Sequence, residues 1–227
     1  MTVPLRLIVF DVDGTLVDSQ RDIIAAMTIA FEQANIPAPQ ACDILSIVGL
    51  SLNVAIERLA PEVRATTRSG LVQGYKDAYM VLRAQTGAAE SSPLYPGAAR
   101  LLTKLQEVPE NILGIATGKS KRGLDKLLDG HSLQNVFVTR QVADFHPSKP
   151  HPAMLLAAMS ETGIAPEHTV MIGDTSYDMD MANAAGTRSI GVSWGYQDVA
   201  RLKAANCVVD SFGALDTALN EVLGVSA

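Results

Sequence analysis

The sequence has few cysteines, and the two it has form no metal or redox motif. Cys42 and Cys207 lie in different halves of the 227-residue chain, which excludes a CxxC pair for zinc binding or disulfide exchange. Two isolated thiols in a chain of this length are typical of a reducing compartment. We interpret both as small apolar side chains.

Long apolar runs and basic clusters are also scarce. The apolar stretch 7–10 leads directly into carboxylates, and no stretch approaches the roughly 20 residues of a membrane span. The net charge is −6, and the basic run 119–122 is interpreted as the first turn of a solvated helix. The sequence therefore predicts a soluble cytoplasmic protein, a monomer or weak homodimer, that binds neither nucleic acid nor membrane.

A packed core is expected, because 48% of the residues are apolar and 19% are charged. Six short apolar runs are interpreted as buried strands, and helical patterns separate most of them. These runs are 5–10, 112–116, 136–138, 169–172, 189–192 and 207–209. Alternating strands and helices predict an α/β fold with a doubly wound, mostly parallel sheet.

One segment, from about residue 19 to residue 89, interrupts this alternation. It contains no convincing strand, but apolar residues recur at helical spacing. The expected helices are 23–34, 44–48, 52–59 and 62–84, followed by a turn-rich stretch at 91–97. The sequence therefore predicts a core of residues 1–17 and 92–227 with an inserted helical domain at 18–91.

The insert is mostly apolar and has no distinctive basic pocket. Arg58, Lys76 and Arg83 could each be surface charges.

Acidic residues follow two of the expected strands. Asp11 and Asp13, with Gly14 and Thr15, come directly after the first strand, and ligands bind at the carboxyl ends of strands in open α/β sheets. The glycine allows backbone N–H groups to approach an anion.

A second acidic group follows the strand at 169–172. Asp174 is expected at the strand tip and Asp178 in the first turn of the next helix. At that position a carboxylate also favours the helix dipole without any functional role.

Two weaker signals lie between these groups. Thr117 and Gly118 follow the strand at 112–116, and a hydroxyl with a free N–H can hold a phosphate oxygen, although Thr-Gly is also a common helix start. Lys149 lies in a proline-rich loop that restricts its backbone, and an aimed ammonium suits a contact with phosphate. Hard oxygen ligands with few protein contacts suit Mg²⁺, so the four groups together predict metal-dependent phosphate chemistry.

These residues resemble the haloacid dehalogenase superfamily, and its phosphatase branch in particular. Segment 11–16 resembles the first motif, Thr117 the second, Lys149 the third, and Asp174 with Asp178 the fourth. The helical insert matches the cap domain of that family in position, and the stretch 149–196 is similar to the phosphoglycolate phosphatase group.

The resemblance implies a role for each matching residue. Asp11 would be the nucleophile that forms an aspartyl-phosphate, and Asp13 the general acid and base. Phosphate contacts are implied for Gly14, Thr15, Thr117, Gly118 and Lys149. Mg²⁺ is the implied cofactor, with ligands from Asp11, Asp13 (through its carbonyl), Asp174 and Asp178.

The expected substrate is a small phosphorylated metabolite, phosphoglycolate or another. Asp13 distinguishes the chain from dehalogenases and phosphonate hydrolases of the superfamily, and Thr15 favours a hydrolase over a sugar phosphomutase. Loop 46–50 lacks the arginine that many phosphoglycolate phosphatase-like caps carry before the glycine, which leaves the substrate open. A phosphomutase, a phospho-receiver and a non-catalytic binding module remain as alternatives.

Overall fold

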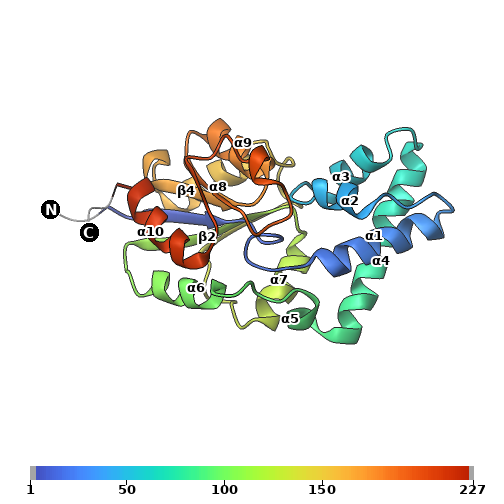
Figure 1. Cartoon of the computed structure of the whole chain (residues 1–227), viewed down its shortest axis with the longest axis horizontal. Helices are drawn as coiled ribbons and strands as arrows, with labels where there is room; N and C mark the ends of the chain where they lie inside the picture. Colours follow the sequence, from blue (N-terminus) through green and yellow to red (C-terminus); the bar gives the residue numbers. More distant parts are fainter. Residues whose placement is uncertain (1–3, 225–227) are drawn as a thin grey trace.

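The computed structural model describes residues 4–224, and its centre is a six-stranded parallel sheet (Figure 1). The strand order is β3-β2-β1-β4-β5-β6, and every neighbouring pair is parallel. The strands are β1 Arg6–Phe10, β2 Asn111–Thr117, β3 Thr139–Val142, β4 Thr169–Gly173, β5 Arg188–Val192 and β6 Cys207–Val209. The predicted α/β fold with a doubly wound sheet is confirmed.

Helices cover both faces of this sheet. One face packs on α6 (Ala98–Gln106), α7 (Lys121–Gly130) and α10 (Phe212–Val222), and the other on α8 (Ala153–Thr162) and α9 (Ser176–Ala185). Successive side chains of a strand point to opposite faces. Accordingly, Ile8 and Phe10 of β1 lie in the first layer, and Leu7 and Val9 lie in the second. This explains why β1 is a continuous apolar run.

The predicted strand at 136–138 is wrong by a few residues. Those residues precede the real edge strand β3, and Val138 is 70% exposed. Strand β3 pairs only with β2, and its buried polar residues are satisfied by side chains: Thr139 donates to Glu161 and accepts from Gln141. Because hydrogen bonds satisfy these groups, the strand has no apolar pattern for sequence analysis to detect.

The segment between β1 and α6 is helical, and Figure 1 shows it as a group of helices beside the sheet. Its helices are α1 Gln20–Gln33, α2 Ala41–Ser46, α3 Leu52–Leu59, α4 Ala65–Thr86 and α5 Ala88–Ser91. Helices α1 to α4 share their own apolar cluster, which includes Met27, Phe31, Ile56 and Leu71. The four expected helices are present, whereas the one-turn α5 was not predicted.

Two chain segments connect this insert to the sheet, and they lie side by side. The N–H of Asp18 donates to the carbonyl of Pro93 (2.9 Å), and the N–H of Tyr95 donates to the carbonyl of Leu16 (3.0 Å). The predicted domain boundaries, 17/18 and 91/92, fall beside this crossing and stay a prediction. The outer ends of the predicted core, 1–3 and 225–227, lie outside the described residues.

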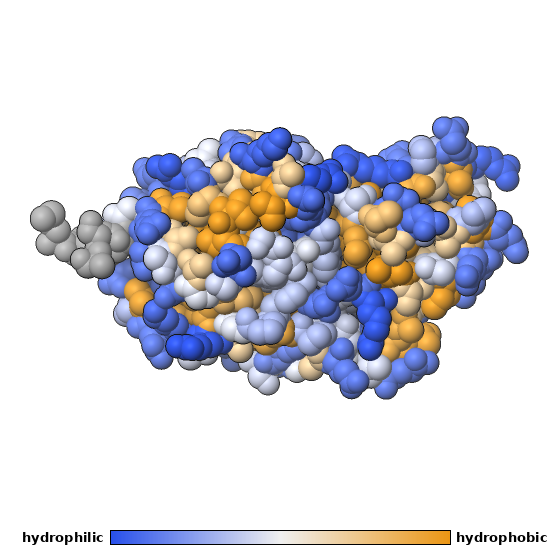
Figure 2. Space-filling model, viewed as in Figure 1, coloured by the Kyte–Doolittle hydropathy of each residue, from blue (hydrophilic) through white to orange (hydrophobic). Residues whose placement is uncertain are grey.

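The surface is mixed in character. Figure 2 shows hydrophilic residues over much of this face, with apolar patches among them in both parts of the molecule. Both cysteines are free thiols; Cys42 is exposed and Cys207 is half-buried. No helix within residues 4–224 combines the length and the hydropathy that crossing a membrane requires.

Candidate active site

Three carboxylates meet at the carboxyl edge of the two central strands. Strands β1 and β4 are neighbours, with Phe10 opposite Ile172, so the residues that follow them are adjacent. Asp11, Asp174 and Asp178 each offer an oxygen within 4.8 Å of the others, and each side chain is at most 1% exposed. Parallel topology thus places residues from two distant segments on one site.

Hydrogen bonds orient two of these carboxylates. Asp178 closes a capping box at the start of α9, because its Oδ2 accepts from the N–H (3.2 Å) and hydroxyl (2.6 Å) of Thr175. Asp174 accepts one hydrogen bond at each oxygen, from the hydroxyl of Thr15 (2.9 Å) and the N–H of Tyr196 (2.8 Å). Each carboxylate retains lone pairs for another partner.

Lys149 supplies a buried positive charge to the same cluster. Its Nζ lies 2.6 Å from Asp178 Oδ1, to which it donates, and 2.8 Å from Asp11 Oδ1 in an ion pair. Burial by itself would lower the pKa of Lys149, but the carboxylates of Asp11 and Asp178 outweigh it and raise that pKa. Lys149 is therefore held as an ammonium.

Asp11 is the least satisfied of the three acids. Within residues 4–224, its Oδ2 has no hydrogen-bond partner, and its Oδ1 has only the Lys149 ammonium, at 2.8 Å. Burial raises the pKa of Asp11 to about 7, although the Lys149 ammonium opposes the rise, and burial also raises the pKa of Asp174 well above its usual value. Three buried carboxylates and one ammonium leave excess negative charge, so these residues fit a divalent cation with hard oxygen ligands.

Asp13 lies beside this cluster and has partners of its own. Its Oδ1 accepts a hydrogen bond from the Ser19 hydroxyl and lies 2.7 Å from Lys119 Nζ. The Lys119 side chain is 10% exposed, so the interpretation of run 119–122 as a solvated helical turn is wrong for this residue. Lys119 precedes the N-cap Ser120 of α7, and its position directly after Thr117-Gly118 was the signal that could have identified it.

The residues predicted from β2 lie at the same edge. Thr117 ends the strand, is 1% exposed, and accepts from the Lys119 N–H through its hydroxyl (3.2 Å). Gly118 lies against the insert, because a Cβ there would be 2.5 Å from the carbonyl oxygen of Leu50 and 2.7 Å from that of Gly49. A glycine is therefore required where the core and the insert loop touch.

Two of the implied phosphate contacts are already engaged elsewhere. The Gly14 N–H donates to the Val17 carbonyl (2.9 Å), and the Thr15 hydroxyl donates to Asp174. For either group to reach a phosphate oxygen, the present bond has to break. In this structure Gly14 and Thr15 shape the loop and orient Asp174.

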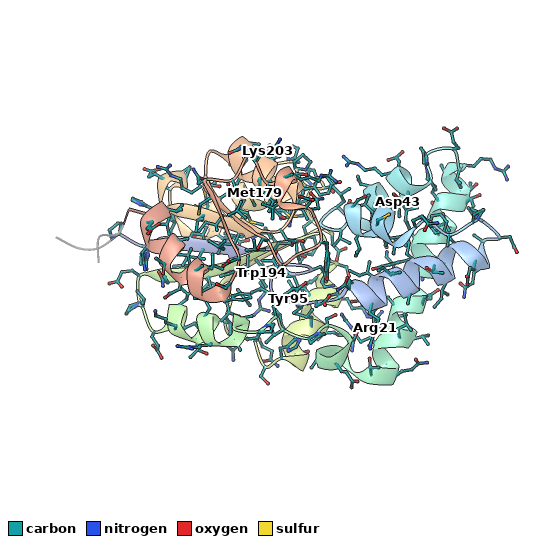
Figure 3. The ribbon with its side chains drawn as sticks, viewed as in Figure 1. Arg21, Asp43, Tyr95, Met179, Trp194 and Lys203 are labelled. Carbon is teal, nitrogen blue, oxygen red and sulfur yellow. The ribbon has the colours of Figure 1, made fainter. Side chains whose placement is uncertain are left out.

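The loop after β5 completes the site, and sequence analysis missed it. Trp194 Nε1 donates to the Thr15 carbonyl (3.1 Å), and Trp194 lies beside Tyr95 (Figure 3). The Tyr196 hydroxyl accepts from the Ser19 N–H (2.7 Å), while its backbone holds Asp174. The available signal was the position of 194–196 just after a strand of the same sheet.

A cavity of about 930 Å³ opens above these residues, between the sheet and the insert. Asp11, Asp13, Thr117 and Lys119 line it from the core. Its size lies within the range of small-molecule sites, and its floor carries carboxylate, hydroxyl and ammonium groups from these four residues.

Gly14 offers a direct test of the crowding around Asp174. It has φ +82°, and a Cβ there would lie 2.3 Å from Asp174 Oδ2. Gly14→Ala is expected to lower the free energy of unfolding by at least about 2 kcal/mol, from left-handed strain and displacement of Asp174.

Gly163→Ala is the matched control, because Gly163 has φ +70° and open space around it. It is expected to cost about 1 kcal/mol from backbone strain alone. Urea unfolding of both variants measures the difference, and equal costs would show that Gly14 is not crowded by Asp174.

Comparison of the sequence with known proteins identifies one family and several similar phosphatases. Residues 8–192 match the family model described as haloacid dehalogenase-like hydrolase. "Probable phosphatase IndB" of Dickeya dadantii is 34% identical over 226 residues, which cover 97% of this chain and 96% of that one. The phosphoglycolate phosphatase of Salmonella typhi is 30% identical over 234 residues, covering 95% and 92%.

Solved structures agree in fold. The crystal structure of a predicted phosphatase from Clostridium acetobutylicum matches with a TM-score of 0.84 at 25% identity, covering 96% of this chain and 100% of that one. The β-phosphoglucomutase of Clostridium difficile, at 21% identity, matches with a TM-score of 0.82 over 97% of each chain. The same fold therefore occurs in a protein described as a predicted phosphatase and in one described as a phosphoglucomutase.

Proposed function

We propose that this chain, a phosphoric monoester hydrolase that belongs to the haloacid dehalogenase-like hydrolase family, releases phosphate from a small phosphorylated metabolite through an aspartyl-phosphate on Asp11. The observation that carries the proposal is the Asp11 carboxylate itself. It lines the cavity, its Oδ1 makes an ion pair with Lys149, and its Oδ2 has no hydrogen-bond partner within residues 4–224. A carboxylate in this state is available to attack phosphorus.

Asp11 and Asp174, with Asp178 beside them, would hold a Mg²⁺ ion. When bound, the ion supplies positive charge that offsets the repulsion between Asp11 and a phosphate dianion. The excess negative charge of the three buried carboxylates supports this assignment.

Asp11 and Asp13 are proposed to carry out two chemical steps, transfer of the phosphoryl group and hydrolysis of the aspartyl-phosphate. An oxygen of Asp11 forms a bond to phosphorus while the bond from phosphorus to the alcohol oxygen breaks, and Asp13 donates a proton to that oxygen. Asp13 then removes a proton from the water that hydrolyses the aspartyl-phosphate. Its contacts with Ser19 and Lys119 hold it in place at the cavity.

Lys149 and Thr117 are proposed to bind the transferring phosphoryl oxygens. Lys149 already lies against Asp11, and its position is restricted because it is buried between two carboxylates. Thr117 lines the cavity at the end of β2. A preorganised cation and hydroxyl of this kind stabilise the charge of the transition state without reorganisation.

The helical insert, residues 18–91, is proposed to be a cap over the site. Its Gly49-Leu50 loop closes on Gly118, and the N–H of Ser51 donates to the hydroxyl of Ser148 (2.9 Å). Such contacts exclude water during attack by Asp11, whereas hydrolysis and product release need the cap to open. The paired connections at 16–18 and 93–95 are where movement would occur.

Phosphate release from a panel of monoesters tests the proposed function. With Mg²⁺, we expect free phosphate from at least one metabolite in a panel of phosphoglycolate, sugar phosphates, nucleotides and p-nitrophenyl phosphate. Chelation should remove the activity and added Mg²⁺ should restore it. An isomerised sugar phosphate without free phosphate would contradict the proposal and identify a mutase.

A further inference from the structure

Arg83, near the end of α4, is a buried arginine with unused hydrogen-bond donors. The residue is 9% exposed, so its interpretation as a possible surface charge is wrong. Its Nη1 donates to the Gly123 carbonyl of α7 (3.3 Å), but Nε and Nη2 have no partner within residues 4–224. A buried guanidinium with free donors is costly unless an anion completes it.

The two free nitrogens form one edge of the guanidinium. Nε and Nη2 point to the same side, which is the edge that binds a carboxylate or phosphate through two parallel hydrogen bonds. An amide or hydroxyl partner would satisfy such an edge less well. The geometry therefore selects for a planar or tetrahedral oxyanion.

Arg83 lines the same cavity as Asp11 and Asp13. Its Cζ lies 5.1 Å from the centre of the Tyr79 ring, and Lys119 Nζ lies 5.5 Å from the same ring. Because Lys119 pairs with Asp13, these contacts connect Arg83 to the proposed proton donor of the leaving alcohol. Arg83 thus lies on the leaving-group side of the site, on the wall that the insert contributes.

Apolar side chains of the insert line the space around Arg83. Ile23, Met27 and Tyr75 line the cavity, and Tyr75 stacks on Tyr79 with 5.8 Å between ring centres. The acidic residues that line the rim, Asp129 and Asp144, are exposed to solvent. The cavity can therefore hold a carbon skeleton that ends in an anionic group.

We propose that Arg83 determines specificity by binding a second anionic group, a carboxylate or a phosphate, on the alcohol that leaves. The inference rests on the proposed function and deepens it, because it assigns the substrate to phosphate monoesters whose alcohol is itself an anion. It assigns recognition of the leaving alcohol to helix α4 rather than to the loop 46–50.

The test compares esters with and without the second anion. The esters whose leaving alcohol carries an anion, called anionic esters, are phosphoglycolate and the bisphosphate of a short diol. The esters whose leaving alcohol is uncharged, called neutral esters, are ethyl phosphate and p-nitrophenyl phosphate. In wild-type protein, kcat/KM is expected to favour the anionic esters. Arg83→Met is expected to lower the ratio of anionic to neutral kcat/KM by roughly 10- to 100-fold, chiefly through KM.

Two further variants keep the test independent of folding. Arg83→Lys retains the charge without the paired donors and should give an intermediate ratio. Arg100→Met removes an exposed charge on α6 and should keep the wild-type ratio. The preferred anionic ester, carboxylate or bisphosphate, identifies which anion is bound.

Two results would overturn the inference. An equal ratio in wild-type and Arg83→Met protein, with both hydrolysing p-nitrophenyl phosphate, would overturn the role of Arg83 alone. A higher kcat/KM of the wild-type protein for the neutral esters would also overturn the role of Arg83. If the wild-type protein releases phosphate from neither kind of ester and from no metabolite of the wider panel, the proposed function fails and the inference fails with it.

Discussion

Replacing Asp11 with asparagine is expected to lower phosphate release by roughly 10⁴-fold or more. Asparagine preserves the shape of the side chain but removes the nucleophilic oxygen that has to bond to phosphorus. No other carboxylate can substitute, because Asp174 and Asp178 each accept hydrogen bonds that hold them in place. The measurement is the initial rate with p-nitrophenyl phosphate and with the best metabolite from the panel.

Asp180→Asn is the matched control, since it makes the same chemical change on an exposed residue of α9. It should retain the wild-type rate. Turnover by Asp11→Asn within about tenfold of wild type would contradict the assignment of the nucleophile.

A stability measurement separates loss of chemistry from loss of fold in the Asp11 variant. The pKa of Asp11 in the folded, metal-free protein is raised by burial to about 7, whereas an unfolded aspartate has a pKa of about 4. The folded state therefore binds the proton more tightly, and ionisation of Asp11 destabilises it as the pH rises between these values. At pH 8, Asp11→Asn is expected to melt at or above the wild-type temperature without added cation.

Replacing Asp174 with asparagine is expected to remove cation binding together with activity. Asp174 is fully buried and belongs to the group of three carboxylates, so an uncharged amide removes one ligand and one negative charge. The carbonyl oxygen of asparagine can still accept from the Tyr196 N–H, and its NH2 group can donate to the Thr15 hydroxyl, which is able to accept as well as donate, so the loop arrangement is expected to persist. The loss should therefore appear in cation affinity rather than in folding.

Thermal unfolding with and without Mg²⁺ measures this directly, without reference to turnover. At a Mg²⁺ concentration 100 times the dissociation constant, binding stabilises the folded state by about 2.7 kcal/mol. For a chain of this size the wild-type melting temperature should rise by roughly 5–10 °C. Asp174→Asn should show almost no rise, and Asp180→Asn should show the full one. An unchanged Mg²⁺ titration in Asp174→Asn would contradict its role as a ligand.

These predictions share one physical basis, the concentration of buried negative charge at the sheet edge. The cluster is unfavourable in the absence of a cation, because burial raises the pKa of both Asp11 and Asp174. The surrounding structure keeps it together: Asp178 is held in the first turn of α9 by its bonds with Thr175, and the loop after β5 holds Asp174. Activity and stability are therefore expected to respond in opposite directions to the loss of Asp11.

The parallel sheet accounts for what could be predicted about the site. A buried parallel strand has a recognisable apolar run, and the carboxyl ends of neighbouring strands meet at one edge. Local sequence was therefore enough to place Asp11, Thr117 and Asp174 at that edge, where the structure has them. The edge strand β3 was misplaced because its polar residues are satisfied by hydrogen bonds and leave no apolar pattern.

The partners of these residues required the tertiary structure. Lys119 has the local appearance of a helix-start cation, and Arg83 that of a surface charge. Arg83 is buried and Lys119 is half-buried because the insert packs on the core, which places Tyr79 of α4 against Lys119 and Arg83 against Gly123. Similarly, the Thr15 hydroxyl donates a hydrogen bond to Asp174, which is remote from it in the sequence.

The sequence by itself determined the α/β fold, the helical insert and the strand ends that carry the proposed chemistry, because periodicity and strand topology are local properties of the chain. The tertiary structure alone decided which charges are buried and which donors remain free. Burial of a charge depends on the contact between segments that are remote in sequence, and neither the insert nor the core contains that information separately. The identity of the leaving alcohol belongs to this second class, since Arg83 becomes a candidate ligand only where the two parts meet.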